Sequence, residues 1–288
     1  MRLFVQMPAY RDPELSSTLL ELYGHADRPS DIRTRVLWQH GEESLESEVR
    51  SLPNLEIVEI PFRESKGSNW ARRRLQESWD GEPFTLFLDS HHRFSRGWDT
   101  TVLGMYQSCR RKSEKPLLTG YLPSYDPVTD PRGRKNEPTK LYPYQREDGV
   151  LVRVTSYPIP FWAGTSEPVE GMFVSLHFLF GAGSLNSEIR FDPDLYYLRD
   201  EVVASVQAFT WGYDVYHPNR VFGWHCYDRG TRVPHWIDRS DWYINQDATL
   251  KKMRSHFMDQ SSAPSGYYGL KRTINEFEER AMIPLVNC

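Results

Sequence analysis

Short apolar runs alternate with segments of helical spacing over the first 110 residues. Runs of strand length fall at residues 3–7, 35–39, 55–60 and 85–88. Leucines recur at helical spacing over residues 15–22, and residues 69–79 and 98–109 also have the character of helices. Strands that alternate with helices in this way are typical of an α/β fold with a mostly parallel central sheet.

The pattern changes in the second part of the chain. Residues 117–122 predict another strand, but from 123 to 160 the periodicity breaks down and seven prolines occur. This stretch is too long for an ordinary connection, which indicates either a functional excursion or a poorly ordered segment. Residues 169–180 resume a buried strand pattern. Gly181-Ala182-Gly183 then predicts a tight turn with a close backbone approach.

The remaining elements are predicted from shorter signals. Residues 200–211 have an apolar helical face, and Gly212 is suited to end that helix. Strands are expected at 214–217 and 221–225, a loop at 228–236, and an amphipathic helix at 269–282. We find no internal repeat, low-complexity segment or linker, so one domain over residues 1–288 is expected.

Composition and charge exclude several classes of protein. The 288 residues are 39% hydrophobic and 26% charged, as expected for a globular domain, and the net charge is −4. No broad basic field favours nucleic acid as the partner. No apolar segment is long enough to span a bilayer, and the first residues predict a strand rather than a signal peptide. Cys109, Cys226 and Cys288 form no CxxC pair, which favours a reducing, cytoplasmic setting over a disulfide framework.

The strongest chemical signal stands where the strand at 85–88 stops, on Asp89-Ser90-His91. Ligands of open α/β sheets bind beyond the carboxyl ends of strands. Two metal-capable side chains separated by one residue can turn toward one divalent cation, which would neutralise phosphate charge. His225, at the end of a later strand, is the best third ligand. Imidazole beside carboxylate favours Mn²⁺ over Mg²⁺. The alternative is an Asp that caps a turn, beside an exposed and a packed histidine.

Basic residues flank this candidate metal site on both sides. Arg72 is one of three consecutive arginines on the preceding helix, which cannot all face the same way, but one of them can reach a nucleotide. The predicted loop at 228–236 can close over a diphosphate and exclude water. Its candidate residues are Arg229, Arg232, His235 and Trp236. The alternative for both groups is a solvated surface.

Asp200 and Glu201 stand at the start of a predicted helix. Acidic residues at that position favour capping and interact well with the helix dipole, which is a sufficient structural explanation. The functional interpretation is that these carboxylates orient hydroxyls of a sugar or an acceptor.

Taken together, several segments resemble glycosyltransferase family 60, the polypeptide α-N-acetylglucosaminyltransferases. The most specific is Leu88-Asp89-Ser90-His91-His92-Arg93-Phe94 with the downstream pair Trp98-Asp99. The other segments follow in order along nearly the whole chain, at residues 9–14, 71–76, 79–82, 180–183, 191–197, 211–214, 217–218, 225–227 and 268–273.

The resemblance implies a GT-A fold, an α/β sandwich around a mixed, mostly parallel sheet flanked by helices. It divides the domain into a nucleotide-binding half, 1–110, and an acceptor half, 111–288, which contains the irregular excursion 123–160. It also implies a UDP-sugar donor, above all UDP-GlcNAc, with Mn²⁺ or Mg²⁺ and transfer with retention. The best-known members of the family are cytoplasmic and modify hydroxyproline on a protein.

The resemblance also implies roles for individual residues. Asp89, His91 and His225 would bind the metal. Ala9, Tyr10 and Arg11 would lie near the uracil and ribose, with Arg72. Asp89, Ser90 and the four candidates of the 228–236 loop complete the residues that we predict to bind the donor. Gly181, Ala182 and Gly183 would border the sugar or the acceptor. Asp200 and Glu201 would hold donor or acceptor hydroxyls.

We therefore predict a metal-dependent retaining glycosyltransferase that moves a sugar from a UDP-sugar to a hydroxyl, with a protein as one class of acceptor and no membrane partner. The same chemistry on a glycan, a small molecule or modified phage DNA is one alternative. A noncatalytic nucleotide-sugar or carbohydrate-binding protein is another. A metal-dependent hydrolase is disfavoured, because no second carboxylate and histidine cluster surrounds His91 to form a two-metal centre.

Overall fold

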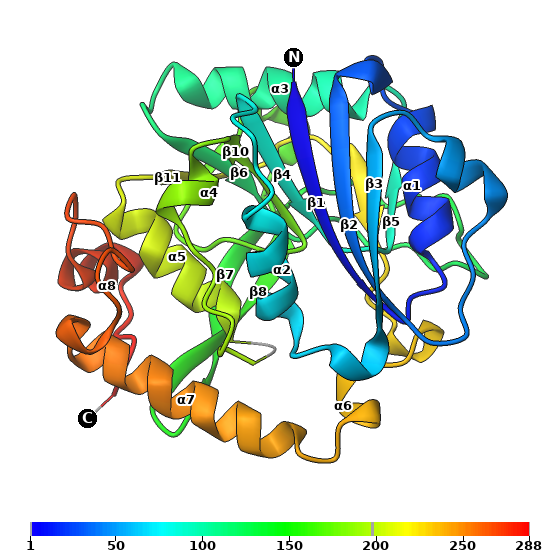
Figure 1. The fold of residues 1–288 in the computed structure, drawn as a ribbon. Helices are drawn as coiled ribbons and strands as arrows, with labels where there is room; N and C mark the ends of the chain where they lie inside the picture. The colour runs from blue at the N-terminus through cyan, green and yellow to red at the C-terminus, as the bar shows by residue number, and fades with distance from the viewer. Residues whose placement is uncertain (1, 197–198, 288) are drawn as a thin grey trace.

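The computed structural model describes residues 2–196 and 199–287 (Figure 1). Cys288 and Tyr197, the last residue of one family-like segment, lie outside the described residues. An eight-stranded sheet forms the centre, in the order β3-β2-β1-β4-β10-β6-β11-β9. Four of its seven neighbouring strand pairs are parallel. The expected α/β class with a mixed, mostly parallel sheet is confirmed.

The first half of the chain supplies four parallel strands, as predicted. They are β1 (Leu3–Tyr10), β2 (Ile32–His40), β3 (Leu55–Pro61) and β4 (Phe84–Leu88). The helices between and after them are α1 (Leu15–Gly24), α2 (Ser68–Gln76) and α3 (Trp98–Arg110). Because these strands run in the same direction, their carboxyl ends meet at one edge of the sheet, where ligands of such folds bind.

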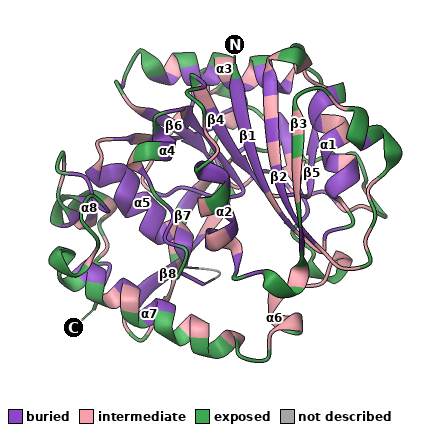
Figure 2. Ribbon diagram, viewed as in Figure 1, coloured by how far each residue is buried: buried purple, intermediate pink, exposed green. Residues whose placement is uncertain are grey.

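Helices cover both faces of the sheet, which therefore has an apolar core on each side. Alternate residues of β1, such as Val5 and Met7, pack with residues of α1 and α3 in one core. On the opposite face, Leu37 packs with Leu75 of α2. A further core on this face includes Ala208 of α5 (Asp200–Thr210). Figure 2 shows the resulting band of buried residues through the central strands.

The second half of the chain completes the sheet with mixed pairing. β10 (Phe178–Ala182) runs antiparallel between β4 and β6 (Pro116–Thr119). β11 (Asp214–His217) lies parallel to β6, and β9 (Val169–Gly171) forms the edge. The prediction of one strand over 169–180 is wrong, because β9 and β10 occupy different places in the sheet. The chain leaves the sheet between them, and the predicted turn begins only at Gly183.

The excursion at 123–160 is ordered over its second part. It contains an antiparallel hairpin of β7 (Thr139–Glu147) and β8 (Val150–Pro158). The turn at Asp148-Gly149 has φ values of 46° and 77°. Positive φ at both central residues is a requirement of the tight hairpin turns that Asp-Gly favours. Leu141 and Leu151 pack with Val202 of α5, so the hairpin belongs to the folded core.

A second small sheet brings distant segments together. β5 (His92–Phe94) pairs antiparallel with β12 (Gly223–His225), and the register sets His225 opposite His92. The predicted strand at 221–225 is therefore confirmed in its last three residues. This pairing carries the end of β12 to the carboxyl edge of β4.

The C-terminal part differs most from expectation. The 17-residue helix α7 (Trp242–Met258) was not predicted, and it packs against the hairpin along the lower edge of Figure 1. The expected helix at 269–282 is shorter, α8 (Ile274–Ala281), because Thr273 and Glu276 form a capping box at its start. Two short helices, α4 (Leu185–Glu188) and α6 (His235–Asp238), complete the α-helices of the described residues.

In the described part of the chain, no helix combines the length and the apolar character needed to cross a bilayer. Cys109 and Cys226 are both buried and free.

Candidate functional site

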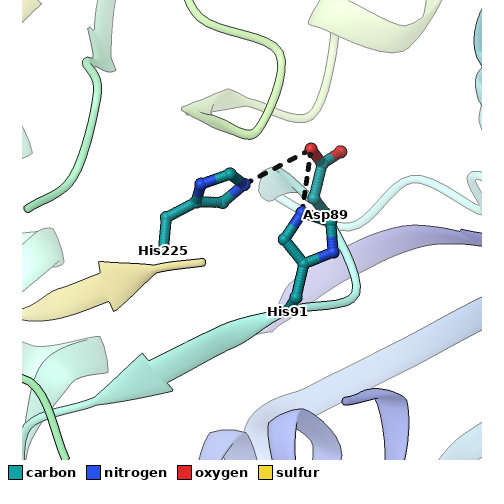
Figure 3. A group of neighbouring side chains, drawn as sticks. All are labelled: Asp89, His91 and His225. Carbon is teal, nitrogen blue, oxygen red and sulfur yellow. Dashed lines mark ion pairs between the residues drawn. The ribbon is translucent and has the colours of Figure 1, made fainter. Parts of the chain in front are cut away.

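Three predicted metal ligands meet at the carboxyl edge of the sheet. Asp89 follows β4, His91 comes two residues later, and His225 ends β12. Oδ2 of Asp89 lies 3.8 Å from Nε2 of His91 and 3.6 Å from Nε2 of His225 (Figure 3). One ligand atom of each residue lies within 4.8 Å of those of the others. Both Nε2 atoms are buried and have no hydrogen-bond partner within residues 2–196 and 199–287, so the three residues fit a shared divalent cation.

Asp12 fixes the orientation of the His91 ring through its other nitrogen, Nδ1. Its Oδ2 lies 2.6 Å from Nδ1 of His91 and accepts a hydrogen bond of 2.6 Å from Oγ of Ser90. Burial opposes ionisation of Asp12, but the charge of His91 and these hydrogen bonds hold the pKa of the carboxyl below its ordinary value. An ionised Asp12 accepts a hydrogen bond from Nδ1–H of His91. The proton then stays on Nδ1, and the lone pair of Nε2 is free to bind a metal, an arrangement known from carboxylate–histidine–metal sites.

Arg72 forms ion pairs with two carboxylates of this site. Its Nη1 donates to Oδ2 of Asp200 at 2.7 Å, and its Nη2 donates to Oδ1 of Asp89 at 3.3 Å. Arg72 is buried, and although burial opposes it, the two carboxylates raise the pKa of its guanidinium. Arg72 in turn lowers the pKa of Asp89 against the effect of burial. It thus orients Asp89, with Oδ2 left toward the histidines.

The neighbouring arginines of α2 face elsewhere, as three consecutive helical residues must. Arg73 pairs with Glu77 at 3.0 Å, and Arg74 lies over the ring of Trp70.

Two further histidines surround His225. The ring of His177 stacks on that of His225 with centroids 4.1 Å apart, and the ring of His92 lies 4.9 Å away. Burial lowers the pKa of His92 to about 3 and that of His177 and His225 well below the ordinary value. These imidazoles are therefore neutral near pH 7, which is the form that ligates a metal.

A cleft of about 790 Å³ opens beside Asp89 at the ends of β1 and β2. We call it the strand-end cleft. Predicted residues that line it are Tyr10, Arg72, Asp89, Ser90 and His91, with Asp12 beside them. Ala9 is fully buried in the core and does not line it. Arg11 does not line it either, since its side chain pairs with Asp238 at 2.9 Å and with Glu43 at 3.0 Å.

The segment predicted as a loop at 228–236 forms the opposite wall of the strand-end cleft. It is partly helical, with a 3-10 turn at Arg229–Thr231 and the start of α6. The residues that line the cleft include all four that were predicted: Arg229, Arg232, His235 and Trp236. Arg229 lies over the ring of Trp236, and α6 is tied to the sheet by a 2.7 Å hydrogen bond from Tyr10 to Asp238. The structure thus brings this segment and Asp89 together.

A second cleft, of about 1040 Å³, lies on the other side of Asp89. We call it the hairpin cleft, because Tyr144 and Arg153 of the β7–β8 hairpin line it. It shares one wall with the strand-end cleft, formed by Ser68, Arg72, Asp89, Arg229 and Arg232. Its other lining residues include Tyr121, His177, Asp200, Glu201, His225 and Tyr227. Asp89, one of the three candidate metal ligands, therefore lies between the two clefts.

Glu201 is the carboxyl group of the hairpin cleft whose pKa is raised. Its Oε2 accepts a 2.5 Å hydrogen bond from Tyr121, and its Oε1 accepts one of 3.0 Å from the backbone of Leu176. Burial, with Asp200 nearby, raises the pKa of Glu201 to about 7 in spite of these bonds. Such a group is suited to exchange hydrogen bonds with a hydroxyl near neutral pH.

The glycine segment lies away from this site. Gly181 and Ala182 pair with Thr85 and Phe84, at the end of β4 remote from Asp89. A Cβ atom on Gly183 would lie 1.9 Å from the carbonyl oxygen of Glu82. The structure therefore gives these residues a packing role and does not bring them together with the ligands.

Sequence reasoning also missed two contributors to the site, Asp12 and His177. Asp12 follows the first strand, at the same sheet edge as Asp89, and this position was its available signal. His177 fell inside the stretch that was predicted as one strand.

Comparisons with known proteins relate the whole chain to one family. The family model described as Glycosyltransferase (GlcNAc) matches residues 2–52 and 41–283. No curated protein matches the chain.

Several solved structures are similar in fold. A structure of GalNAc-T7 with UDP, GalNAc and Mn²⁺ is 13% identical, with a TM-score of 0.60 over 98% of this chain and 55% of that one. A fragment of TarS from S. aureus is 14% identical, with a TM-score of 0.50 over 78% of this chain and 60% of that one. The mannosyltransferase PcManGT from Pyrobaculum calidifontis, with GDP-Man and Mn²⁺, is 13% identical, with a TM-score of 0.51 over 87% and 64%.

At these identities the likeness concerns the fold, and it confirms the expected GT-A architecture. The chain spans between 55% and 64% of the length of these three structures.

Proposed function

The chain belongs to the glycosyltransferase (GlcNAc) family, and from this premise we propose that it is a metal-dependent, retaining enzyme. The donor is a UDP-sugar, with GlcNAc as the sugar, and the acceptor is a hydroxyl group. A cytoplasmic setting is part of the proposal, supported by the two free, buried cysteines.

One observation carries the proposal. The buried Nε2 atoms of His91 and His225 lack partners and face the same carboxylate oxygen of Asp89, at the junction of two clefts. A divalent cation held by these residues, Mn²⁺ or Mg²⁺, supplies positive charge that stabilises a departing diphosphate. Two imidazoles beside a carboxylate favour Mn²⁺.

The strand-end cleft is the proposed donor site. Tyr10 and the neighbouring backbone of Ala9 and Arg11 stand nearest to the position proposed for uracil and ribose. Ser90 and Arg72 lie on the metal side of this cleft. Arg229 and Arg232 supply guanidinium groups for the diphosphate, and the ring of Trp236 excludes water from it.

The hairpin cleft is the proposed acceptor site. Glu201, with its pKa near 7 and its bond to Tyr121, orients a hydroxyl of the acceptor or of the sugar. Asp200 acts through Arg72, which it holds in contact with Asp89. With retention, the acceptor attacks from the face of the leaving group. A phosphate oxygen of the leaving diphosphate then takes the proton, so the proposal needs no separate protein base.

The first test is UDP release by the full chain with UDP-GlcNAc and Mn²⁺. Asp89→Ala is expected to abolish UDP release and Mn²⁺ binding while the circular dichroism spectrum and the cooperative unfolding transition remain. Asp194→Ala is a matched control, because Asp194 is 78% exposed and lines neither cleft. Full activity of Asp89→Ala would refute the site. Donor binding without UDP release would favour the noncatalytic alternative.

A further inference from the structure

Arg153 is the cation of the hairpin cleft that has no partner among the described residues. It lies in β8, opposite Gln145, between the buried residues Val152 and Val154. It lines the cleft, and its Nε is buried without a hydrogen-bond partner. A guanidinium carries five donors and is always charged, so leaving it unbound in a partly buried position costs free energy.

The acidic groups around Arg153 are already engaged. Asp89 and Asp200 share Arg72, and Glu201 accepts from Tyr121 and Leu176. On the hairpin itself, Glu147 pairs with Arg199. A divalent cation at Asp89 would add further positive charge. The hairpin cleft therefore has an electrostatic preference for an anionic ligand.

Exposed tyrosines extend outward from Arg153 along the hairpin. Tyr144, 68% exposed, lines the hairpin cleft. Tyr142 and Tyr157 follow on the exposed part of the two strands, with ring centroids 5.9 Å apart and planes at 63°. These two rings meet edge to face and share no common flat surface. They form an uneven apolar surface that is suited to peptide side chains.

We propose that Arg153 binds a carboxylate of an acidic peptide acceptor, whose hydroxyl-bearing residue lies in the hairpin cleft and whose chain continues over Tyr144. This inference rests on the proposed function, and it names the class of acceptor. A fork of two parallel N–H donors holds a carboxylate in one orientation, and thus sets which hydroxyl reaches the reactive centre.

The test compares two pools of synthetic peptides with the full chain, Mn²⁺ and UDP-GlcNAc. Both pools carry serine, threonine or hydroxyproline. One has Asp or Glu nearby, and the other has Asn or Gln at the same places. An oligosaccharide of glucuronic acid is the third acceptor. Mass spectrometry measures transfer, and UDP release without acceptor measures donor hydrolysis.

We expect at least 10-fold more transfer to the acidic pool than to the amide pool, because this ratio corresponds to the free energy of a charge-assisted hydrogen bond. Arg153→Ala should lower the ratio of transfer to hydrolysis for that pool by about 10- to 100-fold and remove the preference for acidic peptides. Arg153→Lys should recover part of it. Arg190→Ala is the matched control, since Arg190 is exposed and its side chain, among the described residues, bonds only to the nearby carbonyl of Ser187.

Several results would overturn the inference. For the wild type, they are equal transfer to both peptide pools, hydrolysis with transfer to neither pool, and transfer to the oligosaccharide alone. For the variants, the contradicting result is an Arg153→Lys or Arg153→Ala protein that keeps the full preference for acidic peptides. An equal loss of hydrolysis and transfer would move Arg153 to the donor side. Absence of UDP release from the wild-type chain in every arm would instead refute the proposed function.

Discussion

Oδ2 of Asp12 and Nδ1 of His91 lie 2.6 Å apart, in a contact between the end of the first strand and the end of the fourth. The contact fixes which imidazole nitrogen carries the proton. The proposed ligand set therefore depends on a residue that is not itself one of the three candidate ligands.

The first prediction concerns this supporting carboxylate. Asp12→Asn should weaken Mn²⁺ binding by about 10- to 100-fold, because an amide no longer holds His91 with Nε2 free and strongly basic. Isothermal titration calorimetry with Mn²⁺ measures the effect, and Asp194→Asn serves as the exposed control. Unchanged affinity would mean that the orientation of His91 is set by packing alone.

Arg72 should matter for stability as well as for the site. Arg72→Ala leaves the buried carboxylate of Asp200 and the partly buried carboxylate of Asp89 without their shared cation, which we expect to cost about 3–5 kcal/mol of unfolding free energy. Arg73→Ala, one residue away, removes only an exposed pair with Glu77 and should cost less than about 1 kcal/mol. Urea denaturation compares the two variants. A similar small loss for both would show that the buried pair contributes little.

Glu201 predicts a pH dependence of stability. Its pKa is about 7 in the fold, against an ordinary value of 4.5. The folded chain thus keeps a proton that the unfolded chain has already released. The stabilisation by this proton is complete below pH 4.5 and is lost as the pH rises through 7. Relative to Glu201→Gln, the wild type should lose up to about 3 kcal/mol over this range.

Chemical denaturation of both proteins from pH 4 to pH 8 tests the Glu201 prediction. Parallel stability curves would contradict it, and so would a wild type that gains stability over the variant as the pH rises.

A substitution in the glycine segment at residues 181–183 tests whether this segment serves packing of the fold or binding of the metal. Gly183→Ala brings a methyl group against the carbonyl of Glu82, which we expect to cost about 1–3 kcal/mol while Mn²⁺ affinity is unchanged. Gly104→Ala is the control, because no atom lies within 4 Å of the place that a methyl group would take at this position of α3. It should stabilise the helix by about 0.5–1 kcal/mol. Reduced metal affinity of Gly183→Ala would connect this segment to the site after all.

The strands of the first half were predictable because their apolar runs are short and because helices follow three of them, β1, β3 and β4. β1 and β4 are also buried along most of their length, whereas β3 is only partly buried. The hairpin was not, because its prolines hide the alternation of Val152, Arg153 and Val154. Pro143 stands where the register of β7 shifts, so the hairpin tolerates it. Helix α7 was missed because Tyr243 and Ile244 in its first turn are exposed, which blurs the apolar stripe of Leu250 and Met253.

The candidate site also contains residues that the sequence could predict and residues that it could not. Asp89 and His91 are separated by one residue at a strand end, so a local rule finds them. His225 required the assumption of a third ligand, and its place depends on the register of β12 against β5. Asp12 and His177 act only through tertiary contacts, which a local pattern cannot contain.

The pairing of β12 with β5 also has a consequence for the order of biosynthesis. Asp89 and His91 leave the ribosome long before His225, yet the ligand set exists only when the strand that carries His225 has paired with β5. A growing chain that ends before this strand holds two of the three ligands and has no complete cation site. The proposed cation site can therefore be complete only after the chain through His225 has been made and β12 has paired with β5.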